Sequence, residues 1–401
     1  MSGKDPIACK PDTLAQHYSA FRVSDRTLLT GHSHQAWPDV AFDGQKQAWL
    51  DAANLVDDKW SAAFAKAGEV KAFYAGLLGD RGTDHYVLAE NTHELLVRFL
   101  SALPLGSRPR IVTTDGEFHS MRRQLSRLSE EAVEVVVVPT DPVHSLSERV
   151  AGKLNDATGS VMMSAVLYRN AHIVPGLSVV AERAHHLGIP LLVDAYHALN
   201  VMPFELAVQG LTGAFVVGGG YKYCQFGEGN CFMRIPPDCD MRPIVTGWYA
   251  EFGDLSQQSD TNKVGYPRGG DRFSGSTYDP VSHYRAAAVI DFFGSQGLRP
   301  LMLRQISQHQ VGLIIDEFEK LDCDPAHLAR DAIELENIAG FVAFRSNAAA
   351  ALQRMLRCNG IWTDHRGAYL RLGPAPYVSD TQIQDAIAAL GVAIRDHSSR
   401  D

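Results

Sequence analysis

Between residues 85 and 217, short runs of apolar residues alternate with longer stretches in which apolar residues recur every three or four positions. Short runs bounded by turn-forming residues are typical of buried strands, whereas the longer spacing is typical of helices. We therefore predict strands over residues 85–88, 110–114, 133–138, 160–167, 189–193 and 214–217. Strands separated by helices favour an α/β fold with a mostly parallel central sheet and helices on both faces.

The flanking segments predict further elements. Residues 27–30 read as a short strand, residues 229–234 as a hairpin that leaves the site, and residues 281–293 as an amphipathic helix leading to a last region with a strand over 341–344. We expect an N-terminal arm and loop over residues 1–40, a large domain over 41–295 and a smaller α+β domain over 296–401. Residues 250–270, rich in polar residues and glycine, predict a loop that orders over the site.

Apolar residues also recur at helical spacing from Val40 to Leu78. Large apolar side chains on one stripe of a helix usually face the core. We therefore expect core positions at the large residues of this segment, which are Trp49, Leu55, Trp60, Phe64 and Phe73.

Two charged residues follow neighbouring predicted strands. Asp194 ends the run over 189–193, and three glycines after the run over 214–217 lead to Lys222. In open α/β sheets, ligands bind at the carboxyl ends of the strands, so both side chains should face one crevice. Glycine allows a sharp turn and brings the following residue close to a ligand.

A lysine amine and a carboxylate in one crevice are the two groups that pyridoxal phosphate (PLP) requires. The amine holds the cofactor covalently, and the carboxylate keeps the ring nitrogen protonated so that the ring can act as an electron sink. An isolated pair of this kind would more simply be a strand end and a solvated amine. The order of strand, Asp194, spacer, strand, glycines and Lys222 favours the cofactor.

The segment Asp194-Ala-Tyr-His197, followed by Tyr221-Lys222-Tyr223, resembles the fold-type I, class V aminotransferase superfamily of PLP-dependent proteins and, within it, kynureninase. The resemblance implies that Lys222, Asp194, Tyr221 and His197 are catalytic. It also implies hydrolytic cleavage of the Cβ–Cγ bond of a kynurenine-type amino acid, with release of alanine.

Other motifs extend this resemblance to cofactor contacts. Asn91 and Thr92 begin a predicted helix, and a helix N-terminus can hold a phosphate group. Phe118 matches the family residue that stacks on the cofactor ring, although Met121 stands where kynureninase has an aspartate. Trp248, Ser276 and Thr277 match residues that reach the cofactor of a second subunit, which implies a homodimer with shared active sites.

Substrate contacts are expected at two further positions. Ser33 lies in a polar loop that resembles the kynureninase loop over the substrate, and Arg371 precedes a Leu-Gly-Pro-Ala-Pro segment like that of the family's carboxylate-binding arginine. The planar guanidinium group of arginine pairs well with a carboxylate. Asn170 is a further polar candidate beside the cofactor. His32 and His34 alternate without further ligands nearby, so no metal site is expected.

Composition excludes some classes of partner. The chain has 401 residues and a formal net charge of −9, whereas a nucleic-acid-binding domain is usually basic. No apolar run approaches the roughly 20 residues that span a bilayer. The first residues do not resemble a signal peptide, and the six cysteines form no paired motif, so a cytoplasmic protein with reduced thiols is expected.

Three alternatives share parts of this pattern. A class V aminotransferase would use the same lysine, aspartate and arginine but would release a ketoacid. A cysteine desulfurase or related C–S lyase would need a nucleophilic cysteine on a mobile loop, and neither Cys323 nor Cys358 has the Gly/Ser-rich surroundings of such a loop. A PLP-binding sensor without turnover is disfavoured by the presence of both the lysine and the carboxylate-binding arginine.

Overall fold

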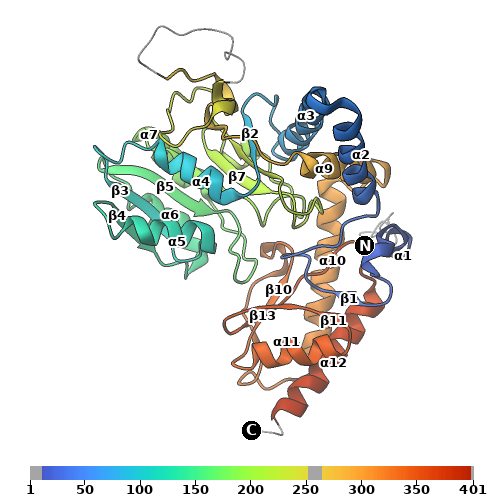
Figure 1. Ribbon diagram of the computed structural model, residues 1–401. Coiled ribbons are helices and arrows are strands. Elements are labelled where there is room, and N and C mark those ends of the chain that lie inside the picture. Colours follow the sequence, from blue (N-terminus) through green and yellow to red (C-terminus); the bar gives the residue numbers. More distant parts are fainter. Residues whose placement is uncertain (1–10, 252–263, 399–401) are drawn as a thin grey trace.

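The computed structural model describes residues 11–251 and 264–398, so most of the loop predicted over 250–270 lies outside the described residues. A seven-stranded sheet forms its centre, with the order β2-β8-β7-β6-β5-β3-β4 (Figure 1). Its strands are β2 (Tyr86–Ala89), β3 (Arg110–Thr114), β4 (Glu134–Val138), β5 (Thr158–Ser164), β6 (Leu191–Asp194), β7 (Phe215–Gly219) and β8 (Cys231–Arg234). Strand β8 pairs antiparallel with β2 and β7, and the other pairs are parallel. The predicted mostly parallel sheet is confirmed.

Helices cover both faces of this sheet because alternate side chains of each strand point to opposite sides. In β6, Leu192 belongs to the core on one face, and Leu191 and Val193 belong to the core on the other. Helices α4 (Thr92–Ser101) and α5 (His119–Leu128) contribute to the first core. Helices α6 (Leu146–Ala151) and α7 (Leu177–His186) contribute to the second.

Helices α2 (Val40–Leu55) and α3 (Lys59–Leu77) pack against α9 (Val281–Ser295). The expected core positions in this pair are wrong for three residues: Trp49 is 77% exposed, Leu55 42% and Phe64 41%. The contact with α9 is made by small residues instead. A Cβ atom on Gly44 would lie 2.5 Å from the carbonyl oxygen of Tyr284, so the helices approach too closely for large side chains. Trp60 and Phe73 are partly buried against core residues.

A second, four-stranded antiparallel sheet has the order β12-β13-β10-β9. Its strands are β9 (Ala329–Arg330), β10 (Val342–Arg345), β12 (Asp364–Arg366) and β13 (Tyr369–Leu372), and the nearby helices are α10 (Pro300–Glu319), α11 (Ala349–Cys358) and α12 (Asp380–Ser398). Strand β1 (Thr27–Leu28) pairs parallel with β11 (Ile361–Trp362). The N-terminal segment is therefore held beside the second sheet, although the predicted domain bounds remain predictions.

The remaining described elements are short. They are α1 (Pro11–Ala15), α8 (Leu206–Gln209) and the 3-10 turns η1 (Gln16–Phe21), η2 (Val56–Asp58), η3 (Val143–Ser145), η4 (Trp248–Glu251), η5 (Gly269–Phe273) and η6 (Leu335–Asn337). The strand predicted over 160–167 ends early at Ser164, because Val166 instead forms an isolated bridge with Ile173. No helix within the described residues combines the length and the apolar character needed to cross a bilayer.

Candidate active site

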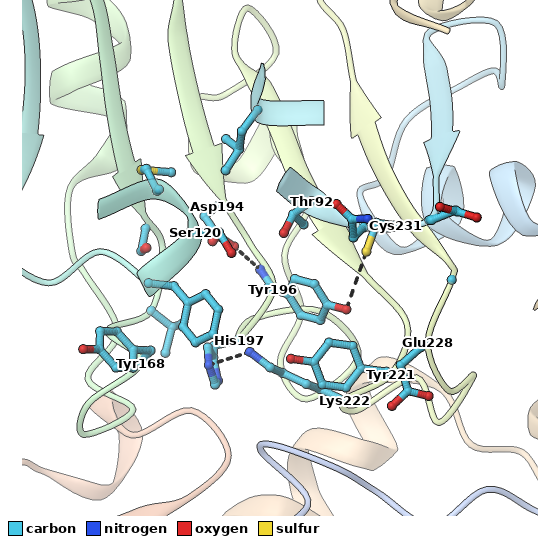
Figure 2. A pocket seen from close by; sticks show the side chains of 18 residues that line it. Thr92, Ser120, Tyr168, Asp194, Tyr196, His197, Tyr221, Lys222, Glu228 and Cys231 are labelled. Carbon is cyan, nitrogen blue, oxygen red and sulfur yellow. Dashed lines mark hydrogen bonds between the residues drawn. The ribbon is translucent and has the colours of Figure 1, made fainter. Parts of the chain in front are cut away.

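A cavity of about 260 Å³ lies where the parallel strands end (Figure 2). Its walls come from segments that follow β2, β3, β6 and β7, together with the end of β5. Seven of the predicted site residues line it: Asn91, Thr92, Phe118, Asp194, His197, Tyr221 and Lys222. The crevice expected from strand order is thus present, and it brings Asp194 and Lys222 together.

Lys222 is buried, with 4% of its surface exposed, and its amine is surrounded by rings. Its Nζ atom lies 2.8 Å from Nε2 of His197 and 4.5 Å from the ring centre of Tyr196, with Phe118 at 5.3 Å. Burial lowers the pKa of Lys222 to about 7, against the opposing effect of the nearby Asp194 charge. A large fraction of the amine is therefore neutral near pH 7.

The three glycines before Lys222 act differently from the prediction. None of them has a positive φ angle, so the chain makes no glycine-specific turn there. Instead, an added Cβ atom would clash with a packed side chain at each position, at 2.4 Å from Leu199 for Gly218, from Tyr196 for Gly219 and from Phe226 for Gly220. The glycines let side chains pack directly on the backbone that carries Lys222.

Asp194 lies at the end of β6 and faces the cavity. One carboxylate oxygen, Oδ1, accepts a hydrogen bond from the backbone N–H of Tyr196 at 2.8 Å. Burial raises the pKa of Asp194, while this hydrogen bond and the charge of Lys222 lower it. The carboxylate is therefore held in a fixed position on the sheet edge.

His197 and Tyr221 flank the amine of Lys222. Burial and then the charge of Lys222 hold the pKa of His197 well below its ordinary value, so the ring is neutral. Burial raises the pKa of Tyr221 to about 12, so its hydroxyl keeps its proton near neutral pH. A neutral acceptor and a protonated hydroxyl thus lie on two sides of the lysine.

Asn91 and Thr92 stand at the start of α4, where the cavity meets the helix. The Oδ1 atom of Asn91 accepts a hydrogen bond from the backbone N–H of Glu94 at 3.0 Å, so Asn91 is the N-cap of α4. The positive end of the α4 dipole therefore points to the cavity, an arrangement that favours an anionic group.

Glu117 is a buried acid that sequence reasoning did not single out. It is 1% exposed and accepts hydrogen bonds from the hydroxyl of Thr114 at 2.5 Å and from that of Ser164 at 2.6 Å. Ser164 pairs with Asp194 across β5 and β6. Burial raises the pKa of Glu117 to about 7. The sequence could have pointed to Glu117, because this carboxylate follows an apolar strand and directly precedes Phe118.

The two predicted substrate residues, Ser33 and Arg371, do not line this cavity. Arg371 is 3% exposed, forms an ion pair with Asp364 and donates from Nη1 to the carbonyl oxygen of Tyr168 at 2.5 Å. Ser33 lines a neighbouring cavity of about 390 Å³ and donates to the carbonyl oxygen of Thr30 at 3.1 Å. Tyr168 lines the first cavity, so Arg371 lies directly behind its wall.

The remaining predicted residues are also elsewhere. Trp248 donates from Nε1 to the hydroxyl of Thr277 at 3.2 Å. Neither of these residues nor Ser276, which precedes Thr277, lines the cavity. Asn170 donates to Asp331 at 3.4 Å and lines a different cavity. Sequence reasoning missed Tyr196, whose hydroxyl lies 3.8 Å from the Cys231 sulfur, although it sits inside the Asp194–His197 motif.

Comparisons with known proteins agree with this architecture. No family model matches the chain. A kynureninase of Geobacillus thermodenitrificans (strain NG80-2) is 21% identical over 384 residues, which cover 91% of this chain and 83% of that protein.

Among solved structures, a mutant of the cystine C–S lyase C-DES with glycine covalently linked to PLP has a TM-score of 0.81 at 15% identity, and the match covers 94% of this chain and 98% of that chain. A cysteine desulfurase of Thermococcus onnurineus NA1 has a TM-score of 0.80 at 15% identity, and the match covers 96% of this chain and 98% of that chain. The predicted fold class is confirmed by the similarity to these solved structures, and a kynureninase, the family whose motifs the chain resembles, is a distant sequence relative.

Proposed function

We propose that this protein is a PLP-dependent enzyme that acts on an amino acid. The observation that carries the proposal is the buried amine of Lys222, which faces a cavity lined also by Asp194 at the carboxyl edge of a parallel sheet. The kynureninase relative and the PLP-linked C-DES structure support the same cofactor and the same class of substrate.

The cavity residues fit the cofactor. The ring of Phe118 offers a flat apolar face 5.3 Å from the Lys222 amine, and the N-terminus of α4 suits a phosphate group. Within the described part of the chain, Nδ1 of His197 is buried without a hydrogen-bond partner, so an acceptor on a bound molecule would satisfy it. Asp194 would hold the proton on the ring nitrogen, and the bound cofactor would supply an electron sink for the substrate's Cα.

Lys222 and His197 would together move the proton at Cα. With a pKa of about 7, the amine can be neutral when it takes up this proton and charged when it returns it. The neutral His197 ring, 2.8 Å away, can accept a hydrogen bond from the charged amine. Tyr221 keeps its hydroxyl proton and can therefore donate it to a leaving group.

We propose a kynureninase-like reaction, namely hydrolytic Cβ–Cγ cleavage of an aryl-keto amino acid that releases alanine. The sequence relative favours this chemistry, and so does Tyr221, which lies beside Lys222 as a protonated hydroxyl. Ser33 and Arg371 would contact the substrate from the side of the second sheet.

A cysteine desulfurase activity is less consistent with the site, despite the similar folds. Among the residues described, Cys231 is the one cysteine that lines the cavity; it is buried, and burial raises the pKa of its thiol to about 12. Such a thiol is a poor nucleophile near neutral pH. Cys323 and Cys358 do not line the cavity. An aminotransferase, which needs no thiol, is the second candidate.

We also propose a homodimer with shared active sites. Large apolar side chains on α2 and α3 are exposed, including Phe42 at 70% and Trp49 at 77%. An exposed aromatic surface of this kind is typical of an interface. The ring of Phe64 contacts that of Tyr249, which in turn contacts that of Trp248, so the aromatic surface extends to Trp248. The resemblance implies that Trp248 reaches the cofactor of a second subunit.

The visible spectrum of the purified protein tests the proposal. We expect the absorbance band of lysine-bound cofactor, and we expect addition of L-kynurenine or 3-hydroxykynurenine to release a product, anthranilate or its hydroxy derivative, detectable by fluorescence. Lys222→Ala should remove the band, and Lys153→Ala, at an exposed site, should keep it. A band that shifts with other amino acids but not with kynurenine would point to the aminotransferase, and a band retained by Lys222→Ala would refute the cofactor assignment.

A further inference from the structure

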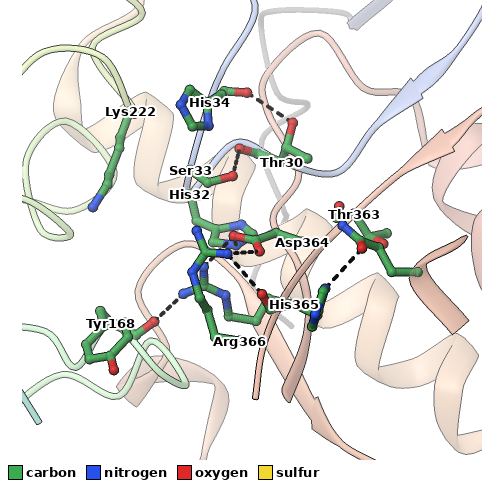
Figure 3. Close-up of polar contacts among 12 residues, drawn as sticks. Thr30, His32, Ser33, His34, Tyr168, Lys222, Thr363, Asp364, His365 and Arg366 are labelled. Atoms are coloured by element: carbon green, nitrogen blue, oxygen red, sulfur yellow. Dashed lines mark hydrogen bonds and ion pairs between the residues drawn. The ribbon is translucent and has the colours of Figure 1, made fainter. Parts of the chain in front are cut away.

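Two arginines, Arg366 and Arg371, pair with the carboxylate of Asp364; Figure 3 shows Arg366 and Asp364. Asp364 pairs through Oδ2 with Nη2 of Arg371 and accepts through Oδ1 a hydrogen bond from Nη1 of Arg366 at 3.0 Å. Asp364 and Arg371 stand opposite each other across strands β12 and β13. The carboxylate therefore fixes both guanidinium groups at the same place.

The cluster of Arg366, Arg371 and Asp364 carries a net charge of +1. Two arginines contribute +2 and Asp364 contributes −1, because its pKa is held low by His32 and by the neighbouring arginines. His32 touches the same carboxylate at 3.6 Å but stays neutral, since burial lowers its pKa to about 3. One further carboxylate would balance the charge.

Arg371 offers little of its guanidinium group to a ligand. Two of its nitrogens are already engaged, with Asp364 and with the carbonyl oxygen of Tyr168. Its Nε atom is buried and has no hydrogen-bond partner among the described residues. A buried donor without a partner is costly unless a bound group satisfies it.

Arg366 differs because its side chain is 45% exposed. Only its Nη1 atom donates hydrogen bonds within the described residues, to Asp364 and to the carbonyl oxygen of His365, each at 3.0 Å. Its positive charge is a minor influence that lowers the pKa of both Lys222 and Tyr221, beside the larger effect of burial. Arg366 also lines the neighbouring cavity that contains Ser33.

We propose that Arg366 is a second contact for the substrate's carboxylate, beside Arg371, and that Asp364 orients both arginines. This inference rests on the proposed function and deepens it, because it makes the substrate an amino acid with a single carboxylate at this end. Arg371 supplies the fixed Nε donor, and Arg366 supplies the exposed nitrogens that close on the ligand.

The experiment uses the full chain with bound cofactor and compares the wild type with three variants that keep the buried Asp364–Arg371 pair, which are Arg366→Gln, Arg366→Lys and Arg354→Gln. Arg354 is an exposed arginine on α11 and is the matched control. L-alanine and L-alaninamide, which differ in the carboxylate, are titrated against the cofactor absorbance band. We expect Arg366→Gln to weaken alanine binding by roughly 10- to 100-fold, as for loss of a hydrogen bond to a charged group, and to leave alaninamide binding unchanged. Arg366→Lys should recover part of the loss.

The proposal is overturned if Arg366→Gln binds alanine like the wild type, if it weakens both probes equally, or if the wild type does not prefer alanine to alaninamide. In each of these cases the cofactor band persists, so the proposed function stands. A wild-type protein without the band would instead reject the proposed function, and the carboxylate contact with it.

Discussion

The Nζ atom of Lys222 lies 2.8 Å from Nε2 of His197, both side chains are buried, and the rings of Tyr196 and Phe118 lie next to the Lys222 amine. In this position the lysine loses much of its hydration, which lowers its pKa from 10.5 to about 7. Burial, and then the charge of Lys222, hold the pKa of His197 well below its ordinary value and keep its ring neutral.

The first prediction follows from this pKa. Only the neutral amine attacks the aldehyde of PLP, so the rate of cofactor uptake by the apoprotein should rise with pH and level off above about pH 7. Stopped-flow absorbance after mixing with PLP measures this rate. A rate that keeps rising toward pH 10, where an ordinary lysine titrates, would contradict the low pKa.

A second prediction concerns Glu117, whose pKa in the folded protein is raised to about 7. The folded state therefore prefers the protonated acid, and wild-type stability should fall as pH rises from about 4.5 to 7. Glu117→Gln keeps hydrogen-bonding groups at this position but cannot ionise. Its free energy of unfolding relative to the wild type should increase by about 2 kcal/mol between pH 5 and pH 8.

Thermal melts at the two pH values measure this difference. Glu130→Gln is the control, since Glu130 is exposed and its ion pair with Arg127 is on the surface. Equal melting-temperature changes for Glu117→Gln at both pH values would show that Glu117 is already ionised in the folded protein at pH 5.

The third prediction tests the glycines that carry Lys222. In Gly219→Ala, the new methyl group would lie 2.4 Å from the Tyr196 hydroxyl and 2.7 Å from the Cys231 sulfur, so the Tyr196 ring must move. That ring lies 4.5 Å from the Lys222 amine. We expect a stability loss of about 1–3 kcal/mol and weaker cofactor binding.

Gly213→Ala is the matched change, because nothing lies within 4 Å of a Cβ atom at Gly213. Differential scanning fluorimetry and titration with PLP give the two readouts. If Gly219→Ala binds PLP as tightly as Gly213→Ala does, the packing of Tyr196 is not needed to place the lysine.

A fourth prediction separates the charge of Asp194 from its structural role. Asp194→Asn keeps an oxygen that can accept the hydrogen bond from the Tyr196 N–H, but it removes the negative charge. We expect the cofactor band to remain and the exchange of the alanine α proton in D₂O to slow by about 10²-fold or more.

Proton NMR follows this exchange without any assumption about the natural substrate. Asp156→Asn, an exposed residue, should exchange at the wild-type rate. If Asp194→Asn exchanged the α proton at the wild-type rate, the charge of Asp194 would not be needed for this proton transfer.

The parallel strands of the central sheet could be predicted from the sequence because short, continuously apolar runs between turn-forming residues usually form buried strands. The sequence also predicted Asp194 and Lys222 as neighbours, since both follow parallel strands whose ends share one edge. The exact role of the glycines could not be predicted, because their contacts with Leu199, Tyr196 and Phe226 depend on packing between distant segments.

The surroundings of Arg371 were harder to predict for a similar reason. A strand arginine before a Pro-rich segment indicates an anion site, but Asp364 reaches it only through the pairing of β12 with β13. His32 comes to the same place from the other end of the chain, because the N-terminal strand β1 pairs with β11, which directly precedes β12. Helical spacing likewise identified the apolar residues of α2 and α3 but not the small residues that pack on α9.

The last prediction concerns that exposed surface. Trp49 is 77% exposed on α2, and a buried dimer interface there would not tolerate a carboxylate, since burying an unpaired charge costs several kcal/mol. We expect the wild type to sediment as a dimer and Trp49→Glu to dissociate at micromolar concentration. Because the aromatic contacts continue from Phe64 to Trp248, the variant should also bind PLP more weakly. Val208→Glu, at an equally exposed apolar site on α8, is the control and should remain a dimer. A monomeric wild type, or a dimeric Trp49→Glu, would mean that this surface has another role and that each active site is complete within one chain.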